Sequence, residues 1–142
     1  MSTGDSLKRF IKAQENDYGK ALSEIRSGRK TSHWMWYIFP QINGLGFSEI
    51  SKFYAIGDRK EASEYLNHKL LGTRLKEITH ELLKLENTNA ASVFGSPDDM
   101  KLKSCMTLFS VVSKDEENIF KKVLDKYFDG EFDGRTLEIL KK

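Results

Sequence analysis

The chain has 142 residues, 39% of them hydrophobic, and its 23 basic residues nearly balance its 21 acidic ones. The aromatic fraction of 11% and the presence of only two prolines argue against disorder, and a net charge of +2 lacks the basic excess of a nucleic-acid-binding domain. The length suits a single domain over residues 1–142 with one hydrophobic core.

Two helices are predicted within the first 28 residues. Apolar residues recur at helical spacing behind Asp5 or Ser6, and either of these can cap the first helix. Asp17 can cap the second, in which the apolar stripe of residues 18–25 is followed by Gly28 as the stop.

A short aromatic helix is predicted next. Thr31 or Ser32 begins it, and it ends before Pro40, because the residue that precedes a proline is driven out of the α region. Its stretch T-S-H-W-M-W-Y-I-F-P-Q holds both tryptophans of the chain and is apolar nearly all round. Such a segment is expected to lie buried at the centre of the domain.

The rest of the chain also reads as helical, because no stretch shows the two-residue alternation of a strand bounded by Asn-Gly or Asp-Gly turns. The clearest start combines Ser96 as a cap, Pro97 at the first helical position, and two aspartates in the first turn. The predicted fold is therefore all-α, a compact single-domain orthogonal bundle of about seven to nine short helices. The later predicted helices span residues 48–54, 58–66, 71–85, 96–112, 119–128 and 136–140, and residues 87–89 form a polar break.

The aromatic helix is the first candidate site. At helical spacing, His33, Trp36, Tyr37 and Pro40 share one side. One interpretation is a core helix whose histidine is hydrogen-bonded to a carbonyl or a carboxylate. The other is that His33, Trp36 and Tyr37 line a cleft, where indole and phenol rings stack on a planar ligand.

The second candidate site is the segment of residues 95–110, which places hydroxyl groups on the inner turns of a helix. Lys103, Thr107 and Ser110 share one stripe, and Met100, Ser104 and Thr107 share another. In one interpretation, the two hydroxyls bond to carbonyls one turn earlier within ordinary packing. In the other, Lys103, Ser104 and Thr107 form a polar patch that binds a ligand.

Charged residues in these two segments supply the candidates for chemistry. Asp98, Asp99 and His33 are the candidate acids or bases, and Lys101 or Lys103 is the candidate partner of a phosphate. A helix N-terminus attracts anions, but two aspartates at this one oppose them, which favours capping over phosphate binding at that turn.

Metal and membrane sites are not expected. His33, His68, His80 and Cys105 lack the spacing of metal ligands, so we predict no metal and no cofactor, and Cys105 falls on an apolar stripe as a core thiol. The N-terminus shows no signal peptide, no apolar run is long enough to span a membrane, and one cysteine fits a reducing compartment. A cytoplasmic location is therefore predicted.

Several motifs resemble one family over nearly the whole chain. They are R-F-I-K-A-Q at 9–14, S-H-W-M-W-Y-I-F-P-Q at 32–41, G-L-G at 44–46, F-G-S-P-D-D-M-K-L-K-S-C-M-T-L-F at 94–109 and Y-F-D-G at 127–130. The family is domain of unknown function 1810, whose members are small, mainly helical, single-domain proteins. Many members carry the label "calpastatin", but calpastatins are long, repetitive and disordered, unlike this chain.

Two positions depart from the family pattern. Lys69 stands where the family usually has proline, and the pair Ser104-Cys105 stands where it usually has two serines. The second departure makes a catalytic hydroxyl at position 105 less plausible, and neither departure affects the expected fold.

The chain also has a more distant similarity to YbiA-like domains, a helical group that handles NAD-derived and ADP-ribose compounds. The shared features are an aromatic segment that ends in glutamine and a later helix in which acids and lysines lead into a methionine. The leading hypothesis is thus a domain that binds a nucleotide-like ligand of the ADP-ribose or NAD type. If the domain is an enzyme, the expected reaction is hydrolysis of that ligand. The alternative is a non-enzymatic interaction or structural domain whose aromatic block is core.

Overall fold

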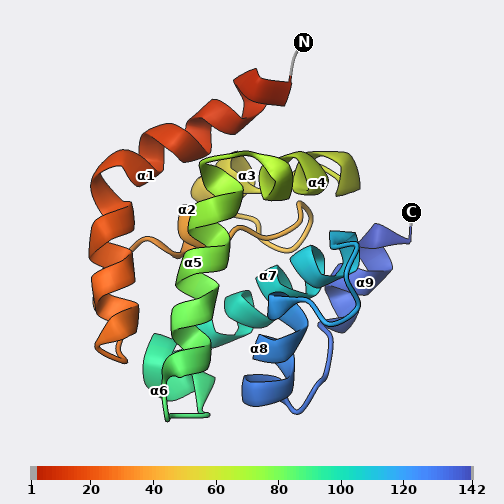
Figure 1. Cartoon of the computed structure of the whole chain (residues 1–142). Helices are drawn as coiled ribbons and strands as arrows, with labels where there is room; N and C mark the ends of the chain where they lie inside the picture. Colours follow the sequence, from red (N-terminus) through yellow and green to blue (C-terminus); the bar gives the residue numbers. More distant parts are fainter. Residues whose placement is uncertain (1–2, 142) are drawn as a thin grey trace.

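The computed structural model describes residues 3–141, and in this range the chain folds into helices joined by short loops, with no β-strand (Figure 1). The predicted all-α fold is thereby confirmed. The described helices are α1 (Thr3–Arg26), α2 (Met35–Ile38), α3 (Glu49–Tyr54), α4 (Arg59–Asn67), α5 (Leu71–Lys84), α6 (Ala90–Phe94), α7 (Asp98–Val112), α8 (Ile119–Phe128) and α9 (Gly134–Leu140).

Helices α5 and α7 organise the packing. Helix α5 contacts α1, α4 and α8, while α7 contacts α4, α6, α8 and α9. In Figure 1, α5 stands upright with α1 on one side and α7 and α8 on the other, and the helices cross in several directions. Between residues 3 and 141, no helix combines the length and the apolar character that crossing a membrane requires.

The predicted pair of N-terminal helices is one continuous helix. Helix α1 begins at Thr3, before the predicted caps, and runs through Asp17 to Arg26, bending partway along its length (Figure 1). Asp17 does not cap a helix; its carboxylate accepts a hydrogen bond from the hydroxyl of Tyr37. Helix α1 continues through Asp17 and Gly19 without a break, so an aspartate inside the helix was misread as a start. The predicted stop at Gly28 is confirmed by its positive φ of 86°.

The start of α7 also differs from its prediction. A short helix that was not predicted, α6, begins after Asn89, whose side chain accepts from the backbone N–H of Ser92 at 3.2 Å. Ser96 does not cap α7, which begins at Asp98 with Pro97 at the N-cap position. The carbonyl of Gly95 accepts the N–H of Asp99 at 2.9 Å and so satisfies a donor that a capping side chain would otherwise take.

Ser48 and Asp58, the first residues of two predicted helices, act as helix caps. The Ser48 hydroxyl accepts from the N–H of Ser51 at 3.2 Å, and an Asp58 carboxylate oxygen accepts from the N–H of Glu61 at 2.8 Å. The predicted helices at residues 48–54, 58–66, 71–85 and 119–128 therefore match α3, α4, α5 and α8 closely.

The core is centred on α7, which is buried on most of its sides. Aromatic rings link it to three other helices: Phe10 packs edge-on against Tyr65 at 5.1 Å, Tyr65 lies 5.4 Å from Phe109, and Phe109 lies 5.8 Å from Phe120. Burying each of these side chains stabilises the fold by roughly 1.5–3 kcal/mol. Cys105 is a buried thiol, as predicted, and burial raises its pKa well above the usual value.

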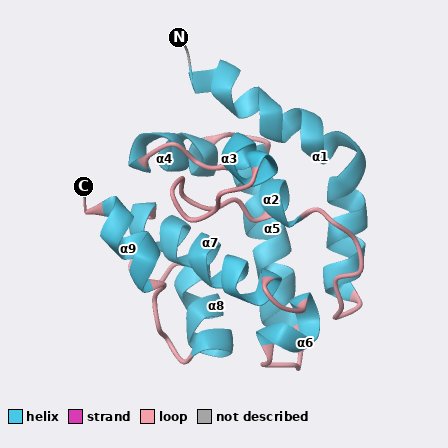
Figure 2. Cartoon of the chain, turned by 180° about the vertical axis from the view of Figure 1, so that it is seen from behind, coloured by secondary structure: helices cyan, strands magenta, loops and turns pink. Residues whose placement is uncertain are grey.

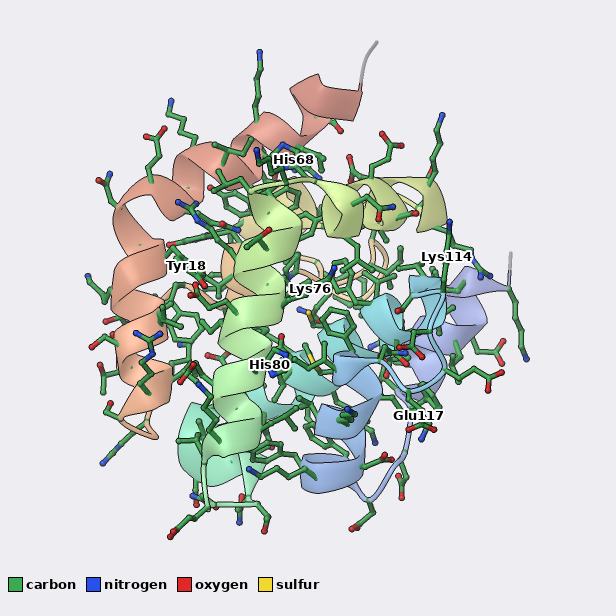
Figure 3. All side chains as sticks on the ribbon, in the orientation of Figure 1. Tyr18, His68, Lys76, His80, Lys114 and Glu117 are labelled. Carbon is green, nitrogen blue, oxygen red and sulfur yellow. The ribbon has the colours of Figure 1, made fainter. Side chains whose placement is uncertain are left out.

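Two long side chains tie α1 and α8 to α5. The Tyr18 hydroxyl of α1 donates to the carboxylate of Glu77 and reaches the carbonyl of Arg74 at 3.0 Å, and Figure 3 shows Tyr18 in the space between α1 and α5. The Lys126 ammonium of α8 donates to the carbonyls of Leu82, Leu83 and Leu85, which are left unpaired at the C-terminal end of α5. Burial lowers the pKa of this lysine.

The carboxylate of Glu24 on α1 holds the segment that leads into α2. It accepts from the N–H of Thr31 at 2.8 Å, from the N–H and hydroxyl of Ser32 at 3.0 and 2.6 Å, and from the indole N–H of Trp34 at 2.9 Å. Residues 31–34 are therefore held as a non-helical anchor, and α2 begins only at Met35, later than predicted.

Replacing Glu24 with alanine should lower the free energy of unfolding by about 2–4 kcal/mol, because several donors lose a charged acceptor. Urea denaturation near neutral pH would measure the loss. Glu15→Ala is the matched control on the same helix, since Glu15 is exposed and has no partner within residues 3–141. Equal stability of the two variants would contradict the role given to Glu24.

The stabilisation by Glu24 should also depend on pH. Burial by itself would raise its pKa, but the hydrogen bonds from Ser32, Thr31 and Trp34 outweigh burial and lower the pKa from 4.5 to about 2. Because the folded state has the lower pKa, this contribution is present above pH 4.5 and is lost as the pH falls toward 2. The stability difference between wild type and Glu24→Ala should shrink across that window as the carboxylate becomes protonated, and a constant difference would refute the assignment.

Candidate functional site

A cleft of about 540 Å³ lies where the loop after α2 approaches α7 and α9, and we name it the α7–α9 cleft. Figure 2 shows this loop between α4 on one side and α7 and α9 on the other. Its walls come from three segments that are far apart in the sequence. They are lined by Trp36, Gln41, Leu45, Gly46, Phe47, Ser48, Ser51, Pro97, Met100, Lys101, Ser104, Asp133 and Arg135.

The loop wall of the cleft is tied at its base. The N–H of Asn43 donates to the carbonyl of Ile56 at 2.8 Å, and the N–H of Ile56 donates to the carbonyl of Gln41 at 2.8 Å. These two bonds close a loop that contains α3. Gly46 lies close to Ser51, because a Cβ at this position would come within 2.5 Å of the Ser51 hydroxyl oxygen. A larger residue at position 46 would therefore push the cleft wall away from α3.

The two tryptophans face different surroundings. Trp34 is 1% exposed, and its indole N–H is bound by Glu24. Trp36 is half-buried and lines the cleft. The aromatic block is thus core on one side and cleft wall on the other.

A lysine and an aspartate of α7 adjoin Trp36. The Lys101 ammonium lies 4.7 Å from the centre of the Trp36 ring and 3.3 Å from the carboxylate of Asp98. The second carboxylate oxygen of Asp98 lies 2.8 Å from the ammonium of Lys30. One carboxylate is thereby shared by two lysines, which leaves an excess of positive charge at the edge of the cleft.

Helix α9 brings Arg135 to the cleft. Asp133 caps this helix, because its carboxylate accepts from the N–H and the hydroxyl of Thr136 at 3.0 and 2.6 Å. The backbone N–H of Asp133 donates to the hydroxyl oxygen of Thr107 on α7 at 2.8 Å. Arg135 follows the cap by two residues and makes no ion pair or hydrogen bond with any residue from 3 to 141.

Apolar side chains form the exposed rim. Phe47 is 81% exposed, and Met100 also presents its side chain to solvent at the cleft. The sequence prediction missed Phe47 and Arg135, and it placed Met100 on the stripe of Ser104 without naming it as a binding residue. Each lies in or beside a turn or on the outer side of a helix, so hydrophobic periodicity gives no signal for them.

Among the residues predicted on the aromatic helix, only Trp36 reaches the cleft. His33 is exposed, does not line the cleft, and forms no side-chain hydrogen bond within the part of the chain that the structure describes. Tyr37 is buried, and its hydroxyl donates a hydrogen bond to Asp17. Its pKa is raised, mainly by burial and secondly by the nearby Asp17 carboxylate. The predicted common face does not form, because the helix begins at Met35 and leaves His33 in the non-helical anchor.

The residues predicted on α7 are also divided. Ser104 lines the cleft, and its hydroxyl donates to the carbonyl of Met100 at 3.2 Å. Lys103 instead lies 3.5 Å from the carboxylate of Glu131, and Thr107 is a buried hydroxyl that donates to the carbonyl of Lys103 at 2.8 Å. The two hydroxyls thus bond to carbonyls one turn earlier, which was the packing interpretation of this segment.

The predicted acids do not stand free in the cleft. Asp98 is neutralised by the two lysines described above. Asp99 is not among the cleft-lining residues, and one of its carboxylate oxygens is buried without a hydrogen-bond partner. Of the residues that line the cleft, Asp133 is the one that carries a carboxylate.

The histidines do not gather into a metal site. The Nδ1 atom of His68 accepts from the N–H groups of Leu70 and Leu71 at 3.1 and 3.2 Å at the start of α5, whereas His80 is exposed farther along that helix (Figure 3). Within residues 3–141, no group of three or more His, Cys, Asp or Glu side chains could hold a metal ion.

Comparisons with known proteins agree with this fold. The family model described as "Protein of unknown function (DUF1810)" matches residues 4–140. Among solved structures, the chain is similar to the crystal structure of the conserved hypothetical protein Rv1873 from Mycobacterium tuberculosis. The TM-score is 0.92, the identity is 43%, and the match covers 96% of each chain. A search of curated proteins gave no match.

Replacing Thr107 with valine should destabilise the protein by about 1–3 kcal/mol, because the N–H of Asp133 loses its acceptor at the start of α9. Thermal or urea unfolding would measure the change. Thr107→Ser keeps the hydroxyl and should retain most of the stability. If serine and valine at this position were equally destabilising, the stabilisation by Thr107 would come from side-chain packing and not from its hydrogen bond to Asp133.

Proposed function

On the premise that this chain belongs to the DUF1810 family of proteins of unknown function, we propose that its α7–α9 cleft binds a small, negatively charged ligand of the ADP-ribose or NAD type, which carries a planar base. The observation that carries the proposal is the composition of the cleft, which places exposed aromatic and apolar side chains beside two cationic ones. Its volume of about 540 Å³ falls in the range of small-molecule sites.

Phe47 is the side chain best placed to stack on a planar ring. One face of Trp36 is already covered by the Lys101 ammonium at 4.7 Å, so a ligand would have to displace that lysine to stack there. Phe47 is 81% exposed and has no ring partner within the described residues. Stacking of a nucleobase on an aromatic side chain contributes about 1–3 kcal/mol.

Polar groups of the cleft suit the remainder of such a ligand. Lys101 and Arg135 attract negative charge, and the side-chain amide of Gln41 has no partner among residues 3–141. An amide both donates and accepts, so Gln41 can bind the edge of a base or a ribose hydroxyl. The distant similarity to YbiA-like domains supports the same class of ligand.

The proposal is for binding. Hydrolysis would require an acid or base within reach of the ligand. Asp98 is poorly suited to that role because it is paired with two lysines, and Asp99 because it does not line the cleft. Asp133 is the carboxylate that lines the cleft, and one of its oxygens is engaged in capping α9.

A second candidate is a protein-interaction domain, and one observation favours it. Phe47, just before α3, and Ile50 and Phe53 on α3 are exposed and recur every three residues, so they form an apolar stripe on the surface. In that case the aromatic block would act only as core. The contribution of Trp36 to a cleft wall favours the ligand-binding proposal instead.

ADP-ribose or NAD at millimolar concentration should raise the melting temperature of the wild-type protein, measured by a thermal-shift assay. Phe47→Ala should weaken binding about tenfold or more, because it removes the stacking surface. Phe53→Ala is the matched control, since Phe53 is also on the exposed stripe, at 58% exposure, but lies outside the cleft. His33→Ala should change neither ligand binding nor stability.

The absence of any stabilisation of the folded protein by these ligands would count against the proposal. Equal losses in Phe47→Ala and Phe53→Ala would point to the apolar stripe on α3 as the functional surface.

A further inference from the structure

We propose that Lys101 and Arg135 form a phosphate subsite at one end of the α7–α9 cleft, and that Asp133 limits the affinity of this subsite for anions. This inference rests on the proposed function and specifies which part of the ligand each side of the cleft binds. The ligand would then be a nucleoside that carries a phosphodiester or a phosphoanhydride, with its base toward Phe47.

Lys101 is held in position before any ligand binds. The face of Trp36 and the carboxylate of Asp98 contact its ammonium at 4.7 and 3.3 Å. Asp98 is also bound at 2.8 Å by Lys30, whose side chain is only 7% exposed, while that of Lys101 is 25% exposed. The positive charge that the carboxylate does not cancel is therefore presented to solvent by Lys101.

Arg135 supplies a second cation in a form suited to phosphate. Its planar guanidinium group can donate two parallel hydrogen bonds to phosphate oxygens. Lys103 on α7 is already engaged, since it pairs with Glu131 at 3.5 Å. Arg135 has no such partner in the described part of the chain, and the cap at Asp133 holds the start of its helix.

Asp133 opposes anion binding at the same place. Its carboxylate lines the cleft together with Arg135. Lys30, Lys101 and Arg135 carry three positive charges, and Asp98 and Asp133 carry two negative ones, so the cleft keeps a single net positive charge. Removal of the Asp133 charge would therefore strengthen the attraction for phosphate.

The test measures binding of ADP-ribose, adenosine and inorganic pyrophosphate by isothermal titration calorimetry at low and high salt. Wild-type protein should bind ADP-ribose at least about tenfold more tightly than adenosine, since adenosine lacks the phosphates. Binding of ADP-ribose and of pyrophosphate should weaken with added salt, whereas adenosine binding should not.

Four variants separate the roles. Arg135→Gln and Lys101→Gln should each weaken ADP-ribose and pyrophosphate binding about tenfold and leave adenosine binding unchanged, which also shows that the cleft is intact. Asp133→Asn keeps the helix cap, because asparagine caps as well as aspartate, and should tighten pyrophosphate binding several-fold. Lys76→Gln on the exposed face of α5 makes the same charge change outside the cleft and should have no effect.

Equal binding of ADP-ribose and adenosine, or unchanged phosphate binding in Arg135→Gln and Lys101→Gln, would overturn the subsite and leave the ligand-binding proposal standing. Weaker or unchanged pyrophosphate binding in Asp133→Asn would overturn the role of Asp133. Failure of all three ligands to bind the folded wild-type protein would overturn both the subsite and the proposed function.

Discussion

The carboxylate of Glu24 is the constraint on which the arrangement of the aromatic block depends. It binds backbone and side-chain donors of residues 31–34, and in doing so it fixes the indole of Trp34 inside the core. Helix α2 then starts one residue later, so Trp36 points to the opposite side and lines the α7–α9 cleft. A single acid on α1 thus decides which tryptophan packs in the core and which one is available to a ligand.

Polar contacts between distant segments also position the walls of the cleft. Asp98 lies between Lys30 and Lys101, so it links the segment that leads into α2 to the start of α7. Thr107 links α7 to α9, because its hydroxyl oxygen accepts a hydrogen bond from the N–H of Asp133 at the start of α9. Asp98, a catalytic candidate in the sequence, and Thr107, a candidate for ligand binding, therefore both contribute to positioning the cleft walls.

Local signals predicted much of the helical structure, and their failures have local causes. Ser48 and Asp58 each follow a loop and precede an apolar stripe, so their capping role could be read directly. Asp17 is also an acid that precedes an apolar stripe, but it lies inside the continuous helix α1, where its carboxylate accepts a hydrogen bond from Tyr37 instead. The five-residue helix α6 was missed because it is shorter than the window over which helical periodicity can be recognised.

The amino-acid sequence by itself determined the all-α class, the capped helices and the burial of an aromatic segment, because these follow from residue types at fixed short spacings. The tertiary structure decided that His33 is exposed, that Trp36 borders a cleft, and that Arg135 joins it from the far end of the chain. The reason is that a cleft between three distant segments depends on long-range hydrogen bonds and ion pairs. Such contacts leave no periodic signal in the sequence.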